Sequence, residues 1–441
     1  MSNVPADEQS SLGPKLVIAV ILTGVAAGLT GMLLGMLLHA VQHLAYGYSL
    51  DKVISQETFL QGVDAASASR RVLVLMLCGL IAGFGWWAVY RFGRPLVSVK
   101  KAVADPDAKM PDTTTLAHAI LQIITVALGS PLGREVAPRE VGALVGGKIA
   151  ALVRLPPEHR RLLIACGSGA GLAAVYNVPL GGAVFVLEVL LATLSWPAVI
   201  MALAACCIGA VVAWIGLGNE TIYIVPPMPL SAGVIAWALL AGPLFGCAAY
   251  GFVRLTTAAR RHAARGWRLP LASLLNFTII GLLAIYLPVL LGNGKGAAQL
   301  GFDGALTIGL ALTLLVLKVA ICVSTLRAGA EGGLMTPGIA IGALLAIVLG
   351  GLWSLVWPGI PVGAFAIIGA AAFLASSMSM PLTAIVLVVE FTRVDHGFQV
   401  PIILAVAGSV MASRLCTARS ARIAVPAKPS MRSPQSLRST E

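Results

Sequence analysis

One apolar stretch occurs twice in this sequence: Asn177-Val-Pro-Leu-Gly-Gly-Ala-Val-Phe-Val-Leu-Glu188, and 202 residues later Ser379-Met-Pro-Leu-Thr-Ala-Ile-Val-Leu-Val-Val-Glu390. Each copy has a Pro-Leu pair near its start and a glutamate at its end. Proline suits the first turn of a helix, because its missing N–H would have no partner there. Both copies are therefore predicted to begin a helix at the proline.

A second pair of segments matches upstream at an offset of 200 residues. Gly129-Ser-Pro-Leu-Gly133, followed by Pro138, resembles Gly329-Ala-Glu-Gly-Gly333, followed by Pro337. Two matches in the same order indicate that the chain consists of two repeats, and broken apolar segments at equivalent places point to a transport site between them. A helix that begins inside a membrane directs unpaired N–H groups and a positive dipole end inward, which favours an anion. Helix breaking for packing alone is the alternative.

The composition requires a lipid environment. Hydrophobic residues make up 58% of the 441 residues and charged residues 11%, and the mean hydropathy is +0.92. A membrane-spanning helix needs about 20 mostly apolar residues, and about a dozen helices of this kind fit the chain. We therefore predict an all-α polytopic, multi-pass membrane protein. The clearest spans are 16–38, 72–90, 197–217, 234–253, 271–291 and 306–325.

The basic residues give the chain a formal net charge of +12, but they lie in short clusters between apolar spans. This pattern is typical of cytoplasmic loops, so we predict orientation signals and no nucleic-acid partner. The seven cysteines lack CxxC spacing, which predicts neither a disulfide framework nor a metal site. The expected organisation is a cytoplasmic tail over 1–14, membrane repeats over 15–222 and 223–424, and a disordered basic tail over 425–441.

Four motifs carry a resemblance to a known family. They are Gly133-Arg-Glu-Val-Ala-Pro138, Gly169 to Leu180 with Glu188, Gly332-Gly-Leu-Met-Thr-Pro337, and Met380-Pro-Leu-Thr383 with Glu390-Phe-Thr392. Together and in this order they resemble the CLC family of chloride channels and chloride/proton exchangers, over about residues 15–424. The resemblance implies a multi-pass protein of the cell's inner membrane. It also implies a homodimer whose subunits each have an anion pore built from two inverted-topology halves, with no cofactor.

The resemblance also implies roles for individual residues. Glu135 falls at the family's gating glutamate, whose carboxylate competes with anions for the outer site and moves away when it is protonated. The anion pathway implied around it comprises Gly133, Arg134, Val136, Gly333, Leu334 and Met335. Two alternatives stay open: Arg139-Glu140 offers a competing alignment that lacks the preceding glycine, and Glu135 could instead form a structural pair with Arg134.

Several residues depart from the family's pattern. Arg94 stands where the family has a serine that contacts the central anion, and no tyrosine follows Tyr286, so Arg422 lies near the place of the family's pore tyrosine. These two arginines either face the pore or extend to the cytoplasmic interface. Val189 stands where many exchangers have a second, proton-relaying glutamate, which leaves proton coupling open. The simplest role for Glu188 and Glu390 is capping or pairing at a helix end.

The sequence thus predicts glutamate-gated transmembrane transport of chloride or a similar small anion, with or without protons. The first alternative is an uncoupled channel or uniporter with altered selectivity. A membrane enzyme or a nonconducting scaffold is the alternative from another class. Gly167-Ser-Gly169 could hold an intramembrane serine nucleophile with His118 as its base, but small residues at helix contacts explain that segment better. We therefore predict no enzymatic activity.

Overall fold

The computed structural model describes residues 6–105 and 107–424, and the side chains of 13–105 and 107–420. Over these residues the chain is helical, and the only strand-like pairing is a bridge between Gly133 and Gly333. This confirms the predicted all-α class. The α-helices are α1 (Ala6–Tyr46), α2 (Phe59–Ala65), α3 (Ala68–Phe92), α4 (Val99–Ala104), α5 (Asp112–Ala127), α6 (Val136–Leu152), α7 (Pro157–Tyr176), α8 (Pro179–Phe185), α9 (Trp196–Leu217), α10 (Ala232–Arg261), α11 (Arg268–Tyr286), α12 (Lys295–Phe302), α13 (Ile308–Arg327), α14 (Met335–Trp353), α15 (Val362–Met378), α16 (Pro381–Thr392) and α17 (Gln399–Ala424).

Three short helices of other types complete the chain. A π-helix, η1 (Val186–Leu191), continues α8, and two 3₁₀ turns, η2 (Pro288–Leu290) and η3 (His396–Phe398), precede α12 and α17. Eight of the described helices are long and apolar enough to cross a membrane. This is fewer than the dozen expected from sequence, because short broken helices such as α8 and α16 do not span a bilayer.

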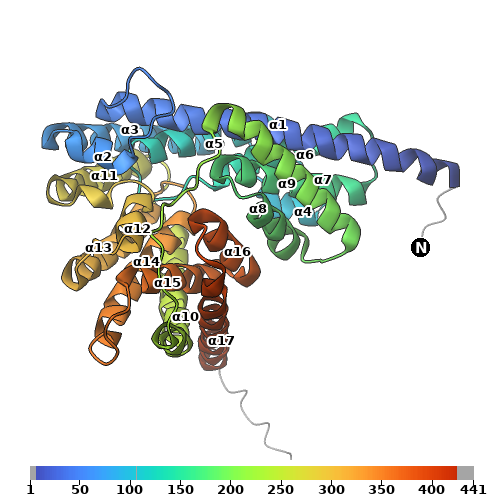
Figure 1. Ribbon diagram of the computed structural model, residues 1–441. Coiled ribbons are helices and arrows are strands. Elements are labelled where there is room, and N and C mark those ends of the chain that lie inside the picture. Colours follow the sequence, from blue (N-terminus) through green and yellow to red (C-terminus); the bar gives the residue numbers. More distant parts are fainter. Residues whose placement is uncertain (1–5, 106, 425–441) are drawn as a thin grey trace, which may run out of the picture.

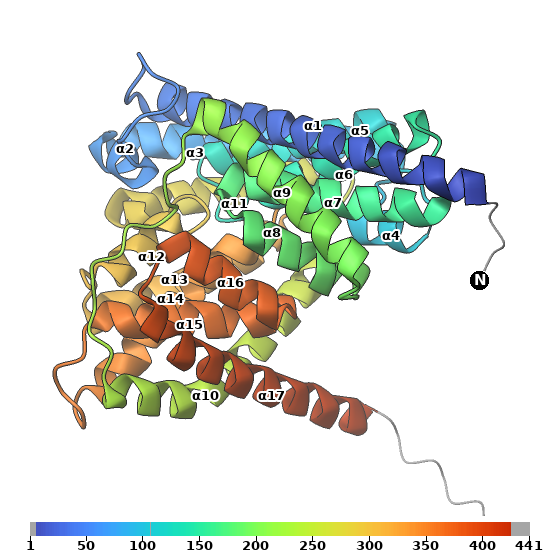
Figure 2. The same cartoon turned by 45° about the vertical axis from the view of Figure 1, so that its right-hand side comes forward.

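The two halves of the fold use the same order of elements. Helices α5 to α9 follow one another as α13 to α17 do, and the helices up to α9 lie in one half of the molecule while α10 to α17 fill most of the other (Figures 1 and 2). Gly129 and Gly329 both have a positive φ, 105° and 94°, just before the broken segments. Asn177 and Ser379, the C-caps of α7 and α15, share a left-handed conformation with φ of 55° and 54°.

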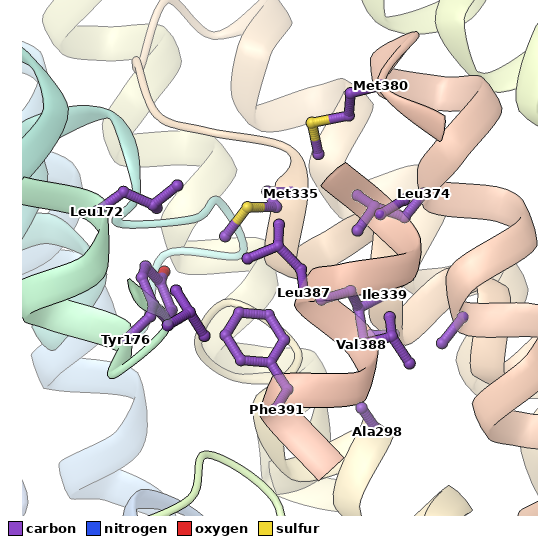
Figure 3. Packing of buried hydrophobic residues seen from close by; sticks show 14 of the residues in the cluster. Leu172, Tyr176, Ala298, Met335, Ile339, Leu374, Met380, Leu387, Val388 and Phe391 are labelled. Carbon is purple, nitrogen blue, oxygen red and sulfur yellow. The ribbon is translucent and has the colours of Figure 1, made fainter. Parts of the chain in front are cut away.

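Helices α7 and α15 form the centre of each half. Every residue from Leu163 to Tyr176 is buried, and so is every residue from Gly363 to Ser376. Small residues permit this close packing: a Cβ on Gly142 of α6 would overlap the carbonyl of Gly167 in α7. Figure 3 shows how larger side chains of α7, α14 and α16 meet between the halves.

The N-terminal boundary differs from the sequence prediction. Helix α1 begins at Ala6, inside the segment expected to be a tail, and its apolar span begins at Gly13. The first residues of α1 are polar but favour helix, so the helix extends past the apolar run. The predicted boundary at 222/223 falls in the connection between α9 and α10 and remains a prediction, while the predicted tail 425–441 lies outside the described residues.

Lys318 is a cation inside an apolar run, and its side chain is held by hydrogen bonds. Its Nζ donates hydrogen bonds to the carbonyl oxygens of Leu290 at 3.1 Å and Gly292 at 2.5 Å. Gly292 in turn donates its N–H to the carbonyl of Gly129 at 3.0 Å. Lys318 therefore stabilises the turn between η2 and α12, which contacts the broken segment of the first half at Gly129.

Candidate functional site

The site begins with a main-chain pair between the two halves. Gly133 and Gly333 donate their N–H groups to each other's carbonyl oxygens at 2.8 and 2.9 Å. These glycines lie shortly before α6 and α14. The pair therefore holds the N-terminal ends of the two helices next to each other, where both leave N–H groups without intrahelical partners.

Glu135 occupies the junction between these helix starts. It is the N-cap residue of α6 and has no solvent exposure. One carboxylate oxygen, Oε1, accepts a hydrogen bond of 2.6 Å from the N–H of Met335, the first residue of α14. The other oxygen, Oε2, accepts a longer contact of 3.5 Å from the hydroxyl of Tyr176. The side chain of one half thus binds the helix start of the other.

The two paired glycines also make room for this carboxylate. A Cβ on Gly133 would overlap Oε2 of Glu135, and a Cβ on Gly333 would overlap Oε1 and Cδ. Only a residue without a side chain lets the backbone approach the group so closely. The glycines are therefore part of the site and not merely helix breakers.

Tyr176 was missed by sequence reasoning. Its hydroxyl also lies 3.3 Å from Oγ1 of Thr336, and the guanidinium carbon of Arg134 lies 5.1 Å from its ring centroid. Tyr176 immediately precedes the repeated stretch at Asn177, and the equivalent residue of the second repeat is Met378. This break in the repeat was the available signal, but it did not reveal which residue the hydroxyl contacts.

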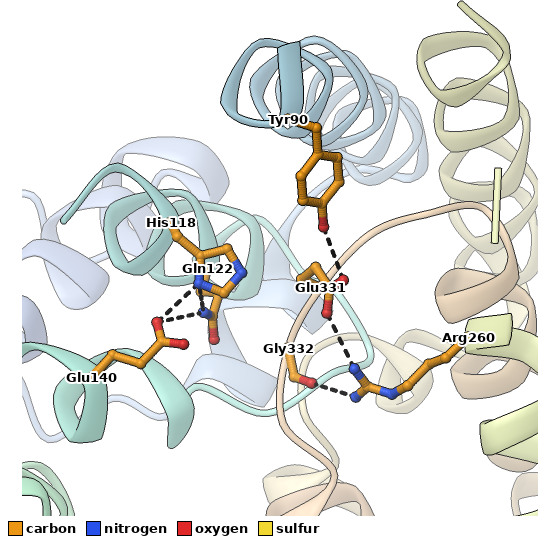
Figure 4. A network of polar contacts seen from close by, with 7 residues as sticks. All are labelled: Tyr90, His118, Gln122, Glu140, Arg260, Glu331 and Gly332. Carbon is orange, nitrogen blue, oxygen red and sulfur yellow. Dashed lines mark hydrogen bonds and ion pairs between the residues drawn. The ribbon is translucent and has the colours of Figure 1, made fainter. Parts of the chain in front are cut away.

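The glutamates of the two candidate alignments, Glu135 and Glu140, have different surroundings. Glu140 lies one and a half turns into α6, and its Oε2 is 2.9 Å from Nδ1 of His118 and 3.4 Å from Nε2 of Gln122 (Figure 4). Glu135, in contrast, lies at the helix start. Among the ion pairs of the described side chains, none joins Glu135 to Arg134. The structural pair considered as an alternative is not formed.

Leu334, Met335 and Val136 lie at the starts of α14 and α6, and their role in an anion pathway stays a prediction. Leu334 is the N-cap residue of α14, and Met335 is buried at its first position. Val136 is the first residue of α6. Glu331, just before this segment, accepts hydrogen bonds from Tyr90 at 2.9 Å and from Arg260 at 3.1 Å (Figure 4). Arg260 also donates to the carbonyl of Gly332 at 3.0 Å, so the segment preceding α14 is held from its other side.

The two arginines predicted near the pore are not brought to Glu135. Arg94 is exposed in the connection between α3 and α4, and its backbone N–H donates to Oγ1 of Thr114 at 3.0 Å. The backbone of Arg422 belongs to α17, but its side chain lies outside the described residues. A pore-facing role for either remains a prediction.

Glu188 and Glu390 cap the broken helices, each in the opposite half. Glu188 accepts hydrogen bonds from the N–H groups of Leu382 and Thr383 at 2.9 and 2.7 Å. Glu390 accepts from Leu180 and Gly181 at 3.0 and 2.6 Å. This confirms the capping interpretation and adds that the caps are exchanged, since each carboxylate neutralises the positive end of the partner repeat's helix.

These caps lead to a stability prediction. Glu390→Gln is expected to lower the free energy of unfolding by about 1–3 kcal/mol. Leu180 and Gly181 donate to different oxygens of Glu390, and glutamine replaces one of these oxygens with an NH2 group, which donates and cannot accept. Thermal unfolding of the purified protein in detergent measures this. The matched control is Glu331→Gln, which breaks a partly exposed pair with Arg260 and should cost no more than about 1 kcal/mol. Equal melting temperatures for Glu390→Gln and the wild type would contradict the capping role.

Comparison with known proteins agrees with this geometry. Residues 78–414 match the family described as voltage gated chloride channel. The chain belongs to this family. It is therefore a membrane transport protein and not an enzyme, as the sequence predicted.

Individual relatives from the voltage gated chloride channel family cover much of the chain. A putative chloride channel protein, ClcB-like, of Ralstonia nicotianae is 30% identical over 76% of this chain and 80% of its own length. An H(+)/Cl(-) exchange transporter, ClcA, of Vibrio vulnificus is 30% identical over 66% of this chain, and the match spans 65% of that relative's own length.

Solved structures of the voltage gated chloride channel family share the fold. A slow cyanobacterial Cl-/H+ antiporter aligns over 93% of this chain and 98% of its own with a TM-score of 0.78 at 19% identity. A CLC-type fluoride/proton antiporter aligns over 94% and 98% with a TM-score of 0.66 at 22% identity. At these identities the similarity establishes the fold alone, including its two inverted-topology repeats.

Proposed function

We propose that this chain carries chloride or a similar small anion across the membrane through the junction of α6 and α14, with Glu135 as the gate. The contact between the Glu135 carboxylate and the Met335 N–H supports this proposal most directly. A carboxylate is a monovalent anion, so it stands in for the transported ion at the helix start. When Glu135 takes up a proton, it loses its charge and leaves these N–H groups to the anion.

The proposed anion cradle is made mainly of backbone. It consists of Gly133, Arg134 and Val136 on one side and Gly333, Leu334 and Met335 on the other, which the main-chain pair holds together. Relatives described as a chloride channel, H(+)/Cl(-) exchanger and fluoride/proton antiporter support a small anion as substrate. Because backbone N–H groups bind any compact anion, the cradle alone does not select one halide.

Protons are the second proposed substrate. Among the described side chains, Glu135 is the one acidic residue that is fully buried. It closes the anion path when ionised and opens it when it accepts a proton. The exchange transporters among the relatives support coupled transport. Val189, in the place of a second glutamate, favours uncoupled anion conduction as the second candidate.

We also propose that the functional unit is a homodimer in the cell's inner membrane. The helix formed by α8 and η1 spans Pro179–Leu191 and α16 spans Pro381–Thr392, so both are shorter than the bilayer. Leu180 in α8 and Leu382 in α16 are exposed, and so is Leu194, which follows η1. Association with a second copy would cover short apolar helices that lipid accommodates poorly.

Anion efflux from liposomes that contain the purified protein tests the proposed function, with proton flux recorded in parallel. Chloride, nitrate, bromide and fluoride are each loaded in turn. We expect efflux of at least one halide above that of protein-free liposomes. Chloride-driven proton uptake against a gradient would establish exchange, and its absence would establish uncoupled conduction. No efflux of any of the four anions would overturn the proposal.

A further inference from the structure

Arg139 directly follows the Gly133–Pro138 motif and lies close to Glu135. The two residues are four positions apart at the start of α6. Residues at this spacing lie on the same face of a helix, one turn apart, with Cβ atoms about 5–6 Å from each other. Arg139 therefore lies on the face that carries the gate, one turn farther along α6. Its guanidinium lies within electrostatic range of Glu135, Glu140 and Tyr176, but none of the three forms a hydrogen bond or ion pair with it among the described residues.

The guanidinium has no protein partner among the described residues. No ion pair there includes Arg139, and its buried Nε donates no hydrogen bond. Its one specific contact is with an aromatic ring, because Cζ lies 4.3 Å from the ring centroid of Phe185 in α8. Stacking satisfies the face of a guanidinium but leaves the N–H groups at its edge available.

Such an arrangement is unfavourable for a purely structural residue. A charged group inside a membrane protein normally pairs with an opposite charge or lines an ion pathway. The neighbouring carboxylates are already engaged elsewhere, since Glu135 accepts from the N–H of Met335 and Glu140 from His118. The N–H groups of Arg139 are therefore left without a hydrogen-bond acceptor among the described residues.

We propose that Arg139 is an anion-binding side chain of the transport pathway. It supplies a fixed positive charge and edge N–H donors one turn along α6 from Glu135. When the Glu135 carboxylate leaves the helix starts, the entering anion takes its place next to the same guanidinium. The inference rests on the proposed function and assigns a specificity-determining side chain to it. Its ligand is a small monovalent anion such as chloride or bromide.

The alternative role for Arg139 is to balance the negative charge of Glu135. The two roles predict different anion affinities when Glu135 is neutral. If Arg139 only balances that charge, its removal from a Glu135→Gln protein should leave anion affinity unchanged. If it binds the transported anion, its removal should weaken binding in that protein as well.

The experiment measures chloride and bromide binding by isothermal titration calorimetry on the purified protein in detergent. Glu135→Gln is compared with Glu135→Gln/Arg139→Gln and Glu135→Gln/Arg139→Lys. We expect Arg139→Gln to raise the dissociation constant about ten- to a hundredfold, as for loss of a charge-assisted hydrogen bond. Lysine keeps the charge, so it should preserve most of the affinity. Unchanged affinity in the glutamine variant would overturn the inference.

Two further variants complete the design. Arg160→Gln is the matched control, because the Nε of Arg160 in α7 also lacks a partner while the residue lies far along the chain from the gate; its affinity should not change. If Arg139→Gln does not fold, Arg139→His replaces it, and anion affinity should then fall between about pH 6 and pH 8 as the imidazole loses its charge. Affinity independent of pH would overturn the inference.

These outcomes are separable from failure of the proposed function. Absence of anion efflux in the wild-type protein would reject transport itself. Normal efflux, together with unchanged binding in Arg139→Gln, would reject only the assignment of Arg139.

Discussion

Anion flux through Glu135→Gln is expected to lose its dependence on pH and to carry no protons. In the wild-type protein the ionised carboxylate occupies the helix starts, so flux should increase as the pH falls and the carboxylate becomes protonated. A carboxyl group changes its ratio of ionised to protonated forms about a hundredfold over two pH units. Glutamine resembles the protonated form at every pH, so the flux should become nearly constant.

Liposome efflux between about pH 4.5 and pH 7.5, a range that includes the usual titration of a carboxyl group, measures this effect. Glu140→Gln is the matched control, because Glu140 lies on the same helix and is bound to His118 rather than to the helix start of α14. It should keep the pH dependence of the wild type. A Glu135→Gln protein that still responds to pH as the wild type does would show that another group is the gate.

Gly333→Ala is expected to displace the Glu135 carboxylate and to destabilise the protein. The added Cβ would overlap Oε1 and Cδ of Glu135, and overpacking of a buried site usually costs about 1–3 kcal/mol. The carboxylate should therefore leave the Met335 N–H, and the pH dependence of flux should weaken. Thermal unfolding in detergent and liposome efflux measure the two effects.

A double substitution tests the cause of this effect. In Glu135→Ala/Gly333→Ala the colliding atoms are gone, so Gly333→Ala should cost much less than it does alone. Gly338→Ala is the control, since a Cβ there would meet Ser377 Oγ at 3.4 Å and Leu374 Cδ1 at 3.7 Å, which are ordinary contacts. Equal effects of Gly333→Ala with and without the Glu135 side chain would contradict the proposed overlap.

The sequence predicted the repeats and the gate for physical reasons that are local. Proline and glycine at fixed offsets mark helix starts, and the glycine before Arg134 distinguished Glu135 from Glu140. In the structure Glu135 accepts a hydrogen bond from the N–H of Met335, whereas Glu140 is bound to His118. A charged residue in an apolar stretch is conspicuous because its burial is expensive.

Contacts between distant segments could not be predicted in the same way. The offset made Glu188 and Glu390 equivalent, but it did not indicate that each caps the helix of the other repeat. The hydroxyl of Tyr176 reaches Glu135 only because α7 packs against α6 through glycines. Such pairings depend on how whole helices pack, and a single sequence records only the residue types at each end.

The exchanged caps also bear on how the protein is made. When the first half has been synthesised, Leu180 and Gly181 still lack Glu390, and Glu135 lacks the N–H of Met335. Glu188 likewise has no N–H donors until Leu382 and Thr383 emerge from the ribosome. Until the second half is inserted, these N–H groups and carboxylates therefore have no hydrogen-bond partners in it. We expect a truncated chain to keep them unsatisfied and to be recognised by cellular quality control.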